Sequence, residues 1–186
     1  MFIQTETTPN PETLKFLPGV GVLPSGSVDY RGPEEAEASP LAQSLFGIEG
    51  VAGVFLGTDF ISVTKQGGEW YHLKPLILGV VMEHFTRGLP VLMEQPSESV
   101  DRGAGMYDEA DGEVVEQITE LLETRVRPVV AQDGGDIVFH GFQEGVVYLH
   151  MQGACAGCPS STMTLKHGIE RMLCHYIPEV TEVRAI

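Results

Sequence analysis

Apolar and polar positions in the first half of the chain alternate in short stretches, and one longer stretch follows a helical period. Four stretches are predicted as strands: 2–7, 13–17, 51–56 and 60–64. A short helix is predicted from Ser39-Pro40 to Phe46, because proline fits the first helical position. A longer helix is predicted over 73–85, where apolar residues recur every three or four positions before Gly88.

Beyond residue 112 the pattern predicts the order helix, strand, strand, helix, strand. The first helix is indicated by apolar residues at helical spacing: Val115, Ile118, Leu122, Val126 and Val129. It ends near Asp133-Gly-Gly-Asp136, where glycine can adopt the left-handed cap conformation. Strands at 137–142 and 146–151 form a predicted hairpin, a helix begins at Pro159, and a last strand covers 181–186.

Residues 96–112 carry no apolar period and consist mainly of small, polar and acidic residues. Such a stretch cannot offset the conformational entropy that it would lose on ordering. The fold class predicted from the sequence is therefore α+β, with two small α+β domains, 1–95 and 113–186, joined by a flexible acidic linker.

The chain carries a formal net charge of −15, from 11 Lys and Arg against 26 Asp and Glu. Such a surface repels phosphate, so we expect neither nucleic acid nor an anionic membrane as a partner. The start of the chain, Met1 to Glu6, resembles neither a signal peptide nor an Arg-rich transit peptide, which predicts a cytoplasmic protein. Cysteines in that compartment serve metals or catalysis more often than disulfides.

All three cysteines, Cys155, Cys158 and Cys174, lie in the last quarter of the chain. Cys155 and Cys158 can face one metal, and the nearby Gly153 and Gly157 allow a close backbone approach. We expect the start of the following helix to lower the pKa of these thiols. That helix is roughly 22 Å long, at about 1.5 Å per residue, when it reaches Cys174. Cys174 is therefore interpreted as a buried core thiol.

The pair of cysteines alone leaves three kinds of site open. A structural zinc site needs two further ligands, and the nearby His167 and His175 both fall on the one following helix. A dithiol redox pair expects a strand–helix–strand context, whereas this pair follows a predicted hairpin. An iron–sulfur cluster usually takes four thiolates, so two chains of a symmetric dimer would share one cluster.

Other polar and aromatic residues have a structural interpretation beside a functional one. Asp133 and Asp136 resemble an acid–base or metal pair but are interpreted as a helix cap and turn. His140 and His150 are interpreted as exposed strand residues, although His150 could act as a ligand through a partner chain. Trp70-Tyr71 is either a docking surface or a partly buried cap.

Several segments of the chain resemble one family. Gly153–Glu170, which contains both cysteines of the pair, resembles the signature of the Nfu-type iron–sulfur carriers, which share the NifU C-terminal domain. Arg127-Pro128 followed by Asp133–Asp136 resembles a second stretch of that domain. Four segments resemble the Nfu N-terminal domain: Phe2–Thr5, Thr8–Pro11, Leu14–Gly19 and Asp59–Lys65.

The resemblance implies that the thiolates of Cys155 and Cys158 hold a 4Fe-4S cluster that bridges two protomers. It implies a homodimer when cluster-loaded, an upstream cluster donor and delivery to apo iron–sulfur client proteins. It also implies that the protein has no catalytic turnover of its own, and that its N-terminal domain contacts partners.

Overall fold

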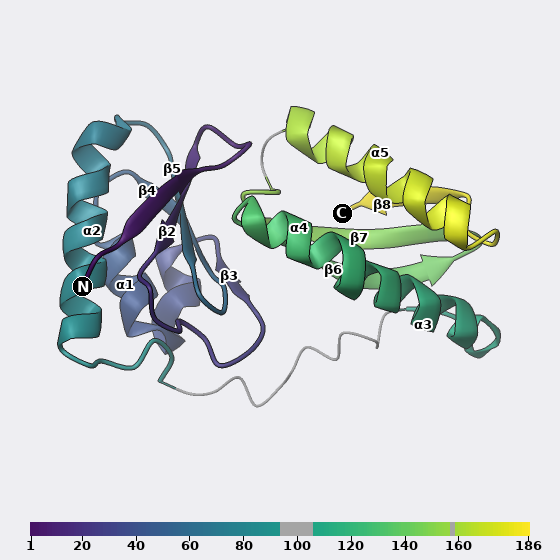
Figure 1. Cartoon of the computed structure of the whole chain (residues 1–186), viewed down its shortest axis with the longest axis horizontal. Coiled ribbons are helices and arrows are strands. Elements are labelled where there is room, and N and C mark those ends of the chain that lie inside the picture. Colours follow the sequence, from purple (N-terminus) through teal and green to yellow (C-terminus); the bar gives the residue numbers. More distant parts are fainter. Residues whose placement is uncertain (94–105, 157–158) are drawn as a thin grey trace. The chain divides into compact units, whose positions relative to one another are not determined.

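The chain folds into two compact units, Met1–Ser97 and Glu98–Ile186, each with its own hydrophobic core (Figure 1). The coordinates are those of a computed structural model, and the structure describes residues 1–93, 106–156 and 159–186, with only the backbone at 159–161. None of the helices in these ranges combines the length and the apolar character that crossing a bilayer requires.

The N-terminal unit is an antiparallel sheet of five strands in the order β1-β2-β5-β4-β3. The strands are β1 (Gln4–Thr7), β2 (Thr13–Leu17), β3 (Val28–Tyr30), β4 (Val51–Leu56) and β5 (Ile61–Lys65). The helices are the 3-10 helix η1 (Pro33–Ala38), α1 (Pro40–Phe46) and α2 (Trp70–Thr86). Apolar residues of α1 and α2 form one core with those of β2, β4 and β5. The mixed content confirms an α+β fold, to which the structure adds β3 and η1.

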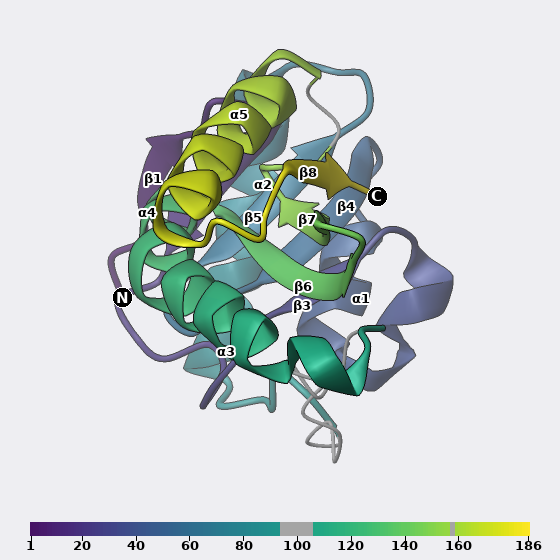
Figure 2. The ribbon, with the colours of Figure 1, turned by 90° about the vertical axis from the view of Figure 1, so that its right-hand side faces the viewer.

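The C-terminal unit is a sheet of three strands in the order β6-β7-β8, with helices on one face (Figures 1 and 2). The strands are β6 (Gly135–Gln143), β7 (Val146–Gly153) and β8 (Glu182–Ala185). The helical segments are η2 (Glu109–Asp111), α3 (Gly112–Leu121), the π-helical turn η3 (Leu122–Val126), α4 (Arg127–Gln132) and α5 (Pro159–Tyr176). The first two strands are antiparallel, whereas β8 runs parallel to β7. The strand–helix–strand unit β7-α5-β8 therefore contains the cysteine loop.

A π-helical turn separates α3 from α4 and shifts the buried face by one residue. The N–H of Arg127 donates to the carbonyl of Leu122, five residues earlier, and Pro128 follows at the start of α4. Proline lacks an N–H and its ring crowds the preceding turn, which accounts for the wider turn at this point. The expectation that Val129 faces the core is consequently wrong, because Val129 is 55% exposed and Val130 is 1% exposed.

The C-terminal unit already has defined structure before α3. Met106 accepts a hydrogen bond from the N–H of Phe142 at 3.0 Å and donates to the carbonyl of His140 at 3.1 Å. These bonds join Met106 to the edge of β6, and η2 follows directly. Residues 106–112 of the predicted linker are therefore ordered, because β6 offers partners that local composition does not reveal. The remaining linker residues, 96–105, lie outside the described ranges.

Side chains also bond to backbone amides at the edges of this sheet. Glu170 of α5 accepts a hydrogen bond from the N–H of Val183 in β8, with a distance of 3.1 Å to Oε2. On β6, the Oδ1 atom of Asp136 accepts the N–H of Ile137 at 2.8 Å. The first contact ties the end of the chain to α5, and the second lies beside the cysteine loop.

Candidate cysteine site

The described part of the cysteine loop, residues 153–156, forms a turn directly at the end of β7. Gly153 has a φ of 61°, in the left-handed region that glycine tolerates best. The N–H of Ala156 donates to the carbonyl of Gly153 at 3.1 Å, and that of Cys155 to Gln152 at 3.3 Å. These bonds hold Cys155 close to the end of β7. Cys158 lies outside the described residues.

Cys155 is packed against the glycine pair that ends α4 and begins β6. Its side chain belongs to the C-terminal core and the residue is 7% exposed. Gly134 takes the predicted left-handed conformation, with a φ of 79°, and its carbonyl accepts the N–H of Ala154 at 3.1 Å. At Gly135 a Cβ atom would lie 2.8 Å from the carbonyl oxygen of Gln152 and 2.9 Å from the nitrogen of Cys155. The site therefore needs a glycine at this position.

Burial raises the pKa of the Cys155 thiol to about 12, and the carboxylates of Asp133 and Asp136 add to this shift. The expectation that the helix start lowers this pKa is wrong, because the surrounding core disfavours the thiolate more strongly. The thiol is consequently protonated near neutral pH, and an incoming metal or cluster iron has to displace that proton. Thr162, in the first turns of α5, donates its hydroxyl to the Cys155 carbonyl at 2.9 Å.

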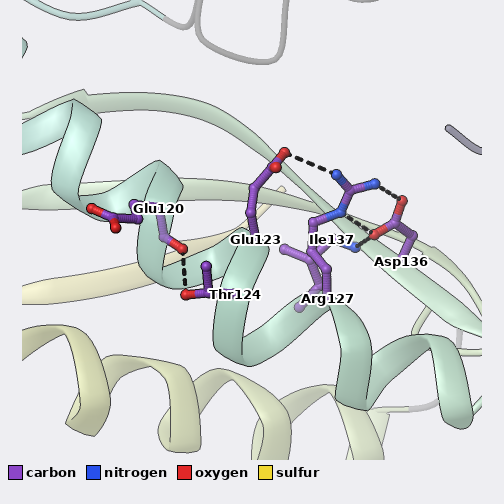
Figure 3. A network of polar contacts seen from close by, with 6 residues as sticks. All are labelled: Glu120, Glu123, Thr124, Arg127, Asp136 and Ile137. Atoms are coloured by element: carbon purple, nitrogen blue, oxygen red, sulfur yellow. Dashed lines mark hydrogen bonds and ion pairs between the residues drawn. The ribbon is translucent and has the colours of Figure 1, made fainter. Parts of the chain in front are cut away.

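Asp136, which directly follows Gly134 and Gly135 in the chain, forms an ion pair with Arg127 (Figure 3). Arg127 donates from Nε to Oδ1 of Asp136 at 2.8 Å and from Nη2 to Oδ2 at 2.7 Å, while its Nη1 meets Glu123 at 3.1 Å. The pKa of Arg127 is raised, and the largest cause is its hydrogen bonding to the side chain of Asp136. Asp133 occupies the C-cap position of α4, as predicted, but Asp136 is neither a cap nor a turn residue. The sequence pattern does not predict that Arg127 is the partner of Asp136, although both residues belong to stretches that resemble the NifU C-terminal domain.

The other candidate residues lie apart from this loop. His140 is exposed on β6, and Nδ1 of the half-buried His150 lies 3.2 Å from the Ile186 carbonyl. Cys174 packs on the core but is only partly buried, which corrects the prediction of a buried thiol. It lies 15 residues after Pro159 on α5, about 22 Å along the helix axis.

The aromatic pair at the start of α2 has two different environments. Trp70 donates its indole N–H to the Pro11 carbonyl at 3.0 Å, so it packs on the domain. Tyr71 is 73% exposed. Throughout the described ranges, no group of three or more His, Cys, Asp and Glu side chains is arranged to hold a metal ion.

The position of the cysteine pair in the fold removes one of the arguments against a dithiol redox site. The hairpin β6-β7 does precede the cysteines, but β7-α5-β8 is also a strand–helix–strand unit. The expectation that the cysteine pair lies outside a strand–helix–strand unit is therefore wrong. A reactive redox cysteine is accessible and has a lowered thiol pKa. Cys155 is buried and its thiol pKa is raised, and both properties argue against a redox role. The topology by itself does not argue against that role.

Two family models match the chain. One, described as "Scaffold protein Nfu/NifU N terminal", covers residues 3–88, and the other, described as "NifU-like domain", covers 118–184. A human protein named "NFU1 iron-sulfur cluster scaffold homolog, mitochondrial" is 50% identical over 188 residues, which are 100% of this chain and 72% of the relative. The chain belongs to the Nfu family.

A relative of the same name from Drosophila sechellia is 53% identical to this Nfu-family chain over 189 residues. The alignment covers all of this chain but 65% of that relative, so the chain spans about two thirds of its length. Among solved structures, the solution structure of a NifU-like protein from Saccharomyces cerevisiae is 29% identical, with a TM-score of 0.47. That match covers 51% of this chain and 87% of the other.

The human and Drosophila sechellia relatives are both named mitochondrial, which contradicts the expected cytoplasmic localisation of this Nfu-family chain. The expectation rested on the first residues of the chain. Since the chain spans only part of its relatives, its first residues carry no information about a targeting segment.

Proposed function

We propose that this chain accepts a 4Fe-4S cluster as cargo on Cys155 and Cys158, holds it between two protomers and passes it to apo iron–sulfur proteins. The packing of Cys155 against Gly134 and Gly135, at the entry to α5, carries the proposal. The backbone of Cys155 is supported there on one side. Its thiol is buried in the empty protein, so loading requires the turn to open, and Gly153 gives that turn conformational freedom. The relatives named as iron–sulfur cluster scaffolds support the same function.

The proposed dimer follows from the number of available thiols. The chain has three cysteines, and Cys174 lies at the far end of α5 from the loop. Each chain therefore offers two thiolates, whereas a 4Fe-4S cluster usually takes four. Two loops related by a two-fold axis supply the full set.

A shared cluster suits a carrier because each chain contributes only half of the ligands. An incoming client thiolate can replace one cysteine at a time, in the manner of a ligand exchange. The proton that leaves Cys155 on loading returns when the cluster departs, since the burial of the empty thiol favours the neutral form. An upstream donor would deliver the cluster by the reverse exchange.

Anaerobic reconstitution followed by native mass spectrometry tests the binding step. We expect about four irons per dimer in the intact chain, and loss of stable binding in Cys155→Ser and in Cys158→Ser. Cys174→Ser is the matched control and should retain the cluster. Full iron and sulfide content in Cys155→Ser would refute the ligand assignment, and one tightly held zinc would indicate a structural metal site instead.

The transfer step is tested by the recovery of activity in an apo 4Fe-4S enzyme under anaerobic conditions with a chelator present. The loaded protein should restore activity faster than free iron and sulfide do. A protein that keeps its cluster but restores no client across several enzymes would be a storage or redox protein, and not a carrier.

A further inference from the structure

Arg127 and Asp136 form an ion pair (Figure 3). Asp136 directly follows Gly135, the glycine that packs against Cys155. Two parallel hydrogen bonds of 2.8 and 2.7 Å join the guanidinium to both carboxylate oxygens, and both side chains are largely buried. A two-bond pair of this kind fixes direction as well as distance, which a single charge contact does not do.

The π-helical turn is what brings Arg127 to this place. Its extra residue rotates α4 relative to α3, so that Arg127 points to the first residues of β6 while Val130 faces the core. Glu123, one turn earlier, holds the guanidinium from the other side at 3.1 Å. The hydroxyl of Thr124, at the same turn, donates to the carbonyl of Glu120 at 2.7 Å, a bond of the kind that accompanies bends in helices.

The restraint reaches the cysteine loop through backbone pairing. Asp136 pairs with Gln152 across the sheet and Gly135 pairs with Gly153, so the start of β6 is in register with the residues that enter the loop. The Oδ1 atom of Asp136, which accepts from Arg127, also accepts the N–H of Ile137 at 2.8 Å. Because Gly135 touches Cys155 with no intervening side chain, a shift of Asp136 moves the surface on which the thiol rests.

We propose that Arg127 and Asp136 are positioning residues for the cysteine loop, which hold Gly135 under Cys155 and so keep the loop in the geometry that receives the cluster. The proposal deepens the proposed function and rests on it for its link to the cluster. The restraint on the loop itself exists without cargo and can be measured in the empty protein.

The first experiment measures amide hydrogen exchange by NMR in the empty full-length chain. The variants are Arg127→Gln, Asp136→Asn, both together, and Arg127→Lys. The matched control is Arg184→Gln, which breaks the exposed pair with Glu182 on β8. The reporting amides are Ala154, Cys155 and Ala156, whose N–H groups close the loop, with β7 amides as the internal reference.

We expect exchange at the three loop amides to accelerate about tenfold or more in Arg127→Gln and Asp136→Asn. Loss of the ion pair should shift the equilibrium between the closed and the open loop by that factor. The β7 amides should accelerate much less. The double variant should match the single ones, because both remove one shared interaction. Arg127→Lys should restore only part of the protection, since lysine keeps the charge but not the paired geometry.

The second experiment measures the half-life of the reconstituted cluster and its visible circular dichroism. Arg127→Gln should still take up a cluster, because both cysteines remain, but the half-life should fall several-fold and the spectrum should change shape. Arg184→Gln should match the unmodified chain in both. A change in the cluster spectrum separates positioning from a general loss of stability, which leaves the spectrum of the bound fraction unaltered.

Equal acceleration of loop and β7 amides in Arg127→Gln would overturn the proposal, because the pair would then only stabilise the whole unit. An unchanged cluster spectrum and half-life, with the loop amides accelerated, would overturn the link to the cargo. If the unmodified chain binds no cluster, the proposed function fails by itself, while the hydrogen-exchange result still decides whether the ion pair restrains the loop.

Discussion

Gly135 lies so close to Cys155 that a single added methyl group would collide with the cysteine backbone nitrogen, 2.9 Å away. This contact links the glycine pair of the C-terminal unit to its cysteine loop. It also predicts that Gly135 does not tolerate a side chain, whereas Gly168 does.

Gly135→Ala should displace the loop, weaken cluster binding and cost roughly 1–3 kcal/mol of unfolding free energy, as overpacking of a core does. Gly168→Ala is the matched control, because a Cβ there meets nothing within 4 Å outside its own helix. It should stabilise α5 by roughly 0.5–1 kcal/mol and leave the cluster in place. Urea unfolding and iron content check both variants, and a cluster-competent Gly135→Ala would contradict the close packing.

The register shift at the π-helical turn makes two neighbouring valines unequal. Val130→Ala should lower the free energy of unfolding by roughly 1.5–3 kcal/mol, because its side chain is buried in the core. Val129→Ala should change it by less than about 0.5 kcal/mol, because that side chain faces solvent. Urea unfolding followed by the NMR signals of β7 measures both. The opposite ranking would mean that the helix continues without the extra residue.

His84 makes the stability of the N-terminal unit depend on pH. Burial lowers its pKa below the ordinary value of 6.5, against backbone hydrogen bonds at Pro90 and Leu89, and its buried Nε2 lacks a partner among the described residues. The unfolded chain therefore binds a proton more readily. The stabilisation that results from keeping His84 neutral is complete above pH 6.5. It is lost as the pH falls from 6.5 through the lowered pKa of His84 in the folded chain.

Trp70 is the chain's only tryptophan, so its fluorescence reports unfolding of the N-terminal unit alone. Between pH 7.5 and pH 5.5, values chosen to lie about one unit either side of the ordinary histidine pKa, the intact chain should lose more stability than His84→Gln. His72→Gln changes an exposed histidine on the same helix and should follow the intact chain. Parallel curves for the intact chain and His84→Gln would exclude His84 as the cause.

A fragment of residues 106–186 should fold and bind a cluster without the rest of the chain, since it contains every thiol and a complete core. A fragment of residues 112–186 should be less stable by roughly 1–2 kcal/mol, because it lacks the two hydrogen bonds of Met106 to β6. Thermal unfolding of the two fragments measures the difference. If the longer one fails to bind a cluster that the full chain binds, the division between the two units is wrong.

Local signals in the sequence located the elements that local interactions stabilise. The strand Thr13–Leu17 and the helix Pro40–Phe46 were predicted with the bounds that the structure shows. Ser39 caps that helix by accepting the N–H of Ala42 at 3.1 Å, which is a short-range interaction that a sequence reveals. Strand β3 was missed because its three residues depend on pairing with β4.

Features that depend on distant residues could not be predicted in the same way. The pairing of Arg127 with Asp136 spans nine positions and follows no helical or strand period. The raised pKa of Cys155 comes from the core that closes around it, whereas the sequence showed only the start of a helix. Apolar spacing predicted Val129, and not Val130, on the buried face of the helix, because that spacing does not reveal the wider turn before Pro128.

The contacts at the sheet edges have a consequence for aggregation. The outer amides of Ile137, Phe142 and Val183 are already occupied, by Asp136, Met106 and Glu170 respectively. A strand from another molecule that approached these positions would have to displace an existing bond before forming its own. Association through strand addition is thereby disfavoured at these three positions. A dimer of the proposed kind would then form through loops and side chains more readily than through pairing at these positions of the sheet.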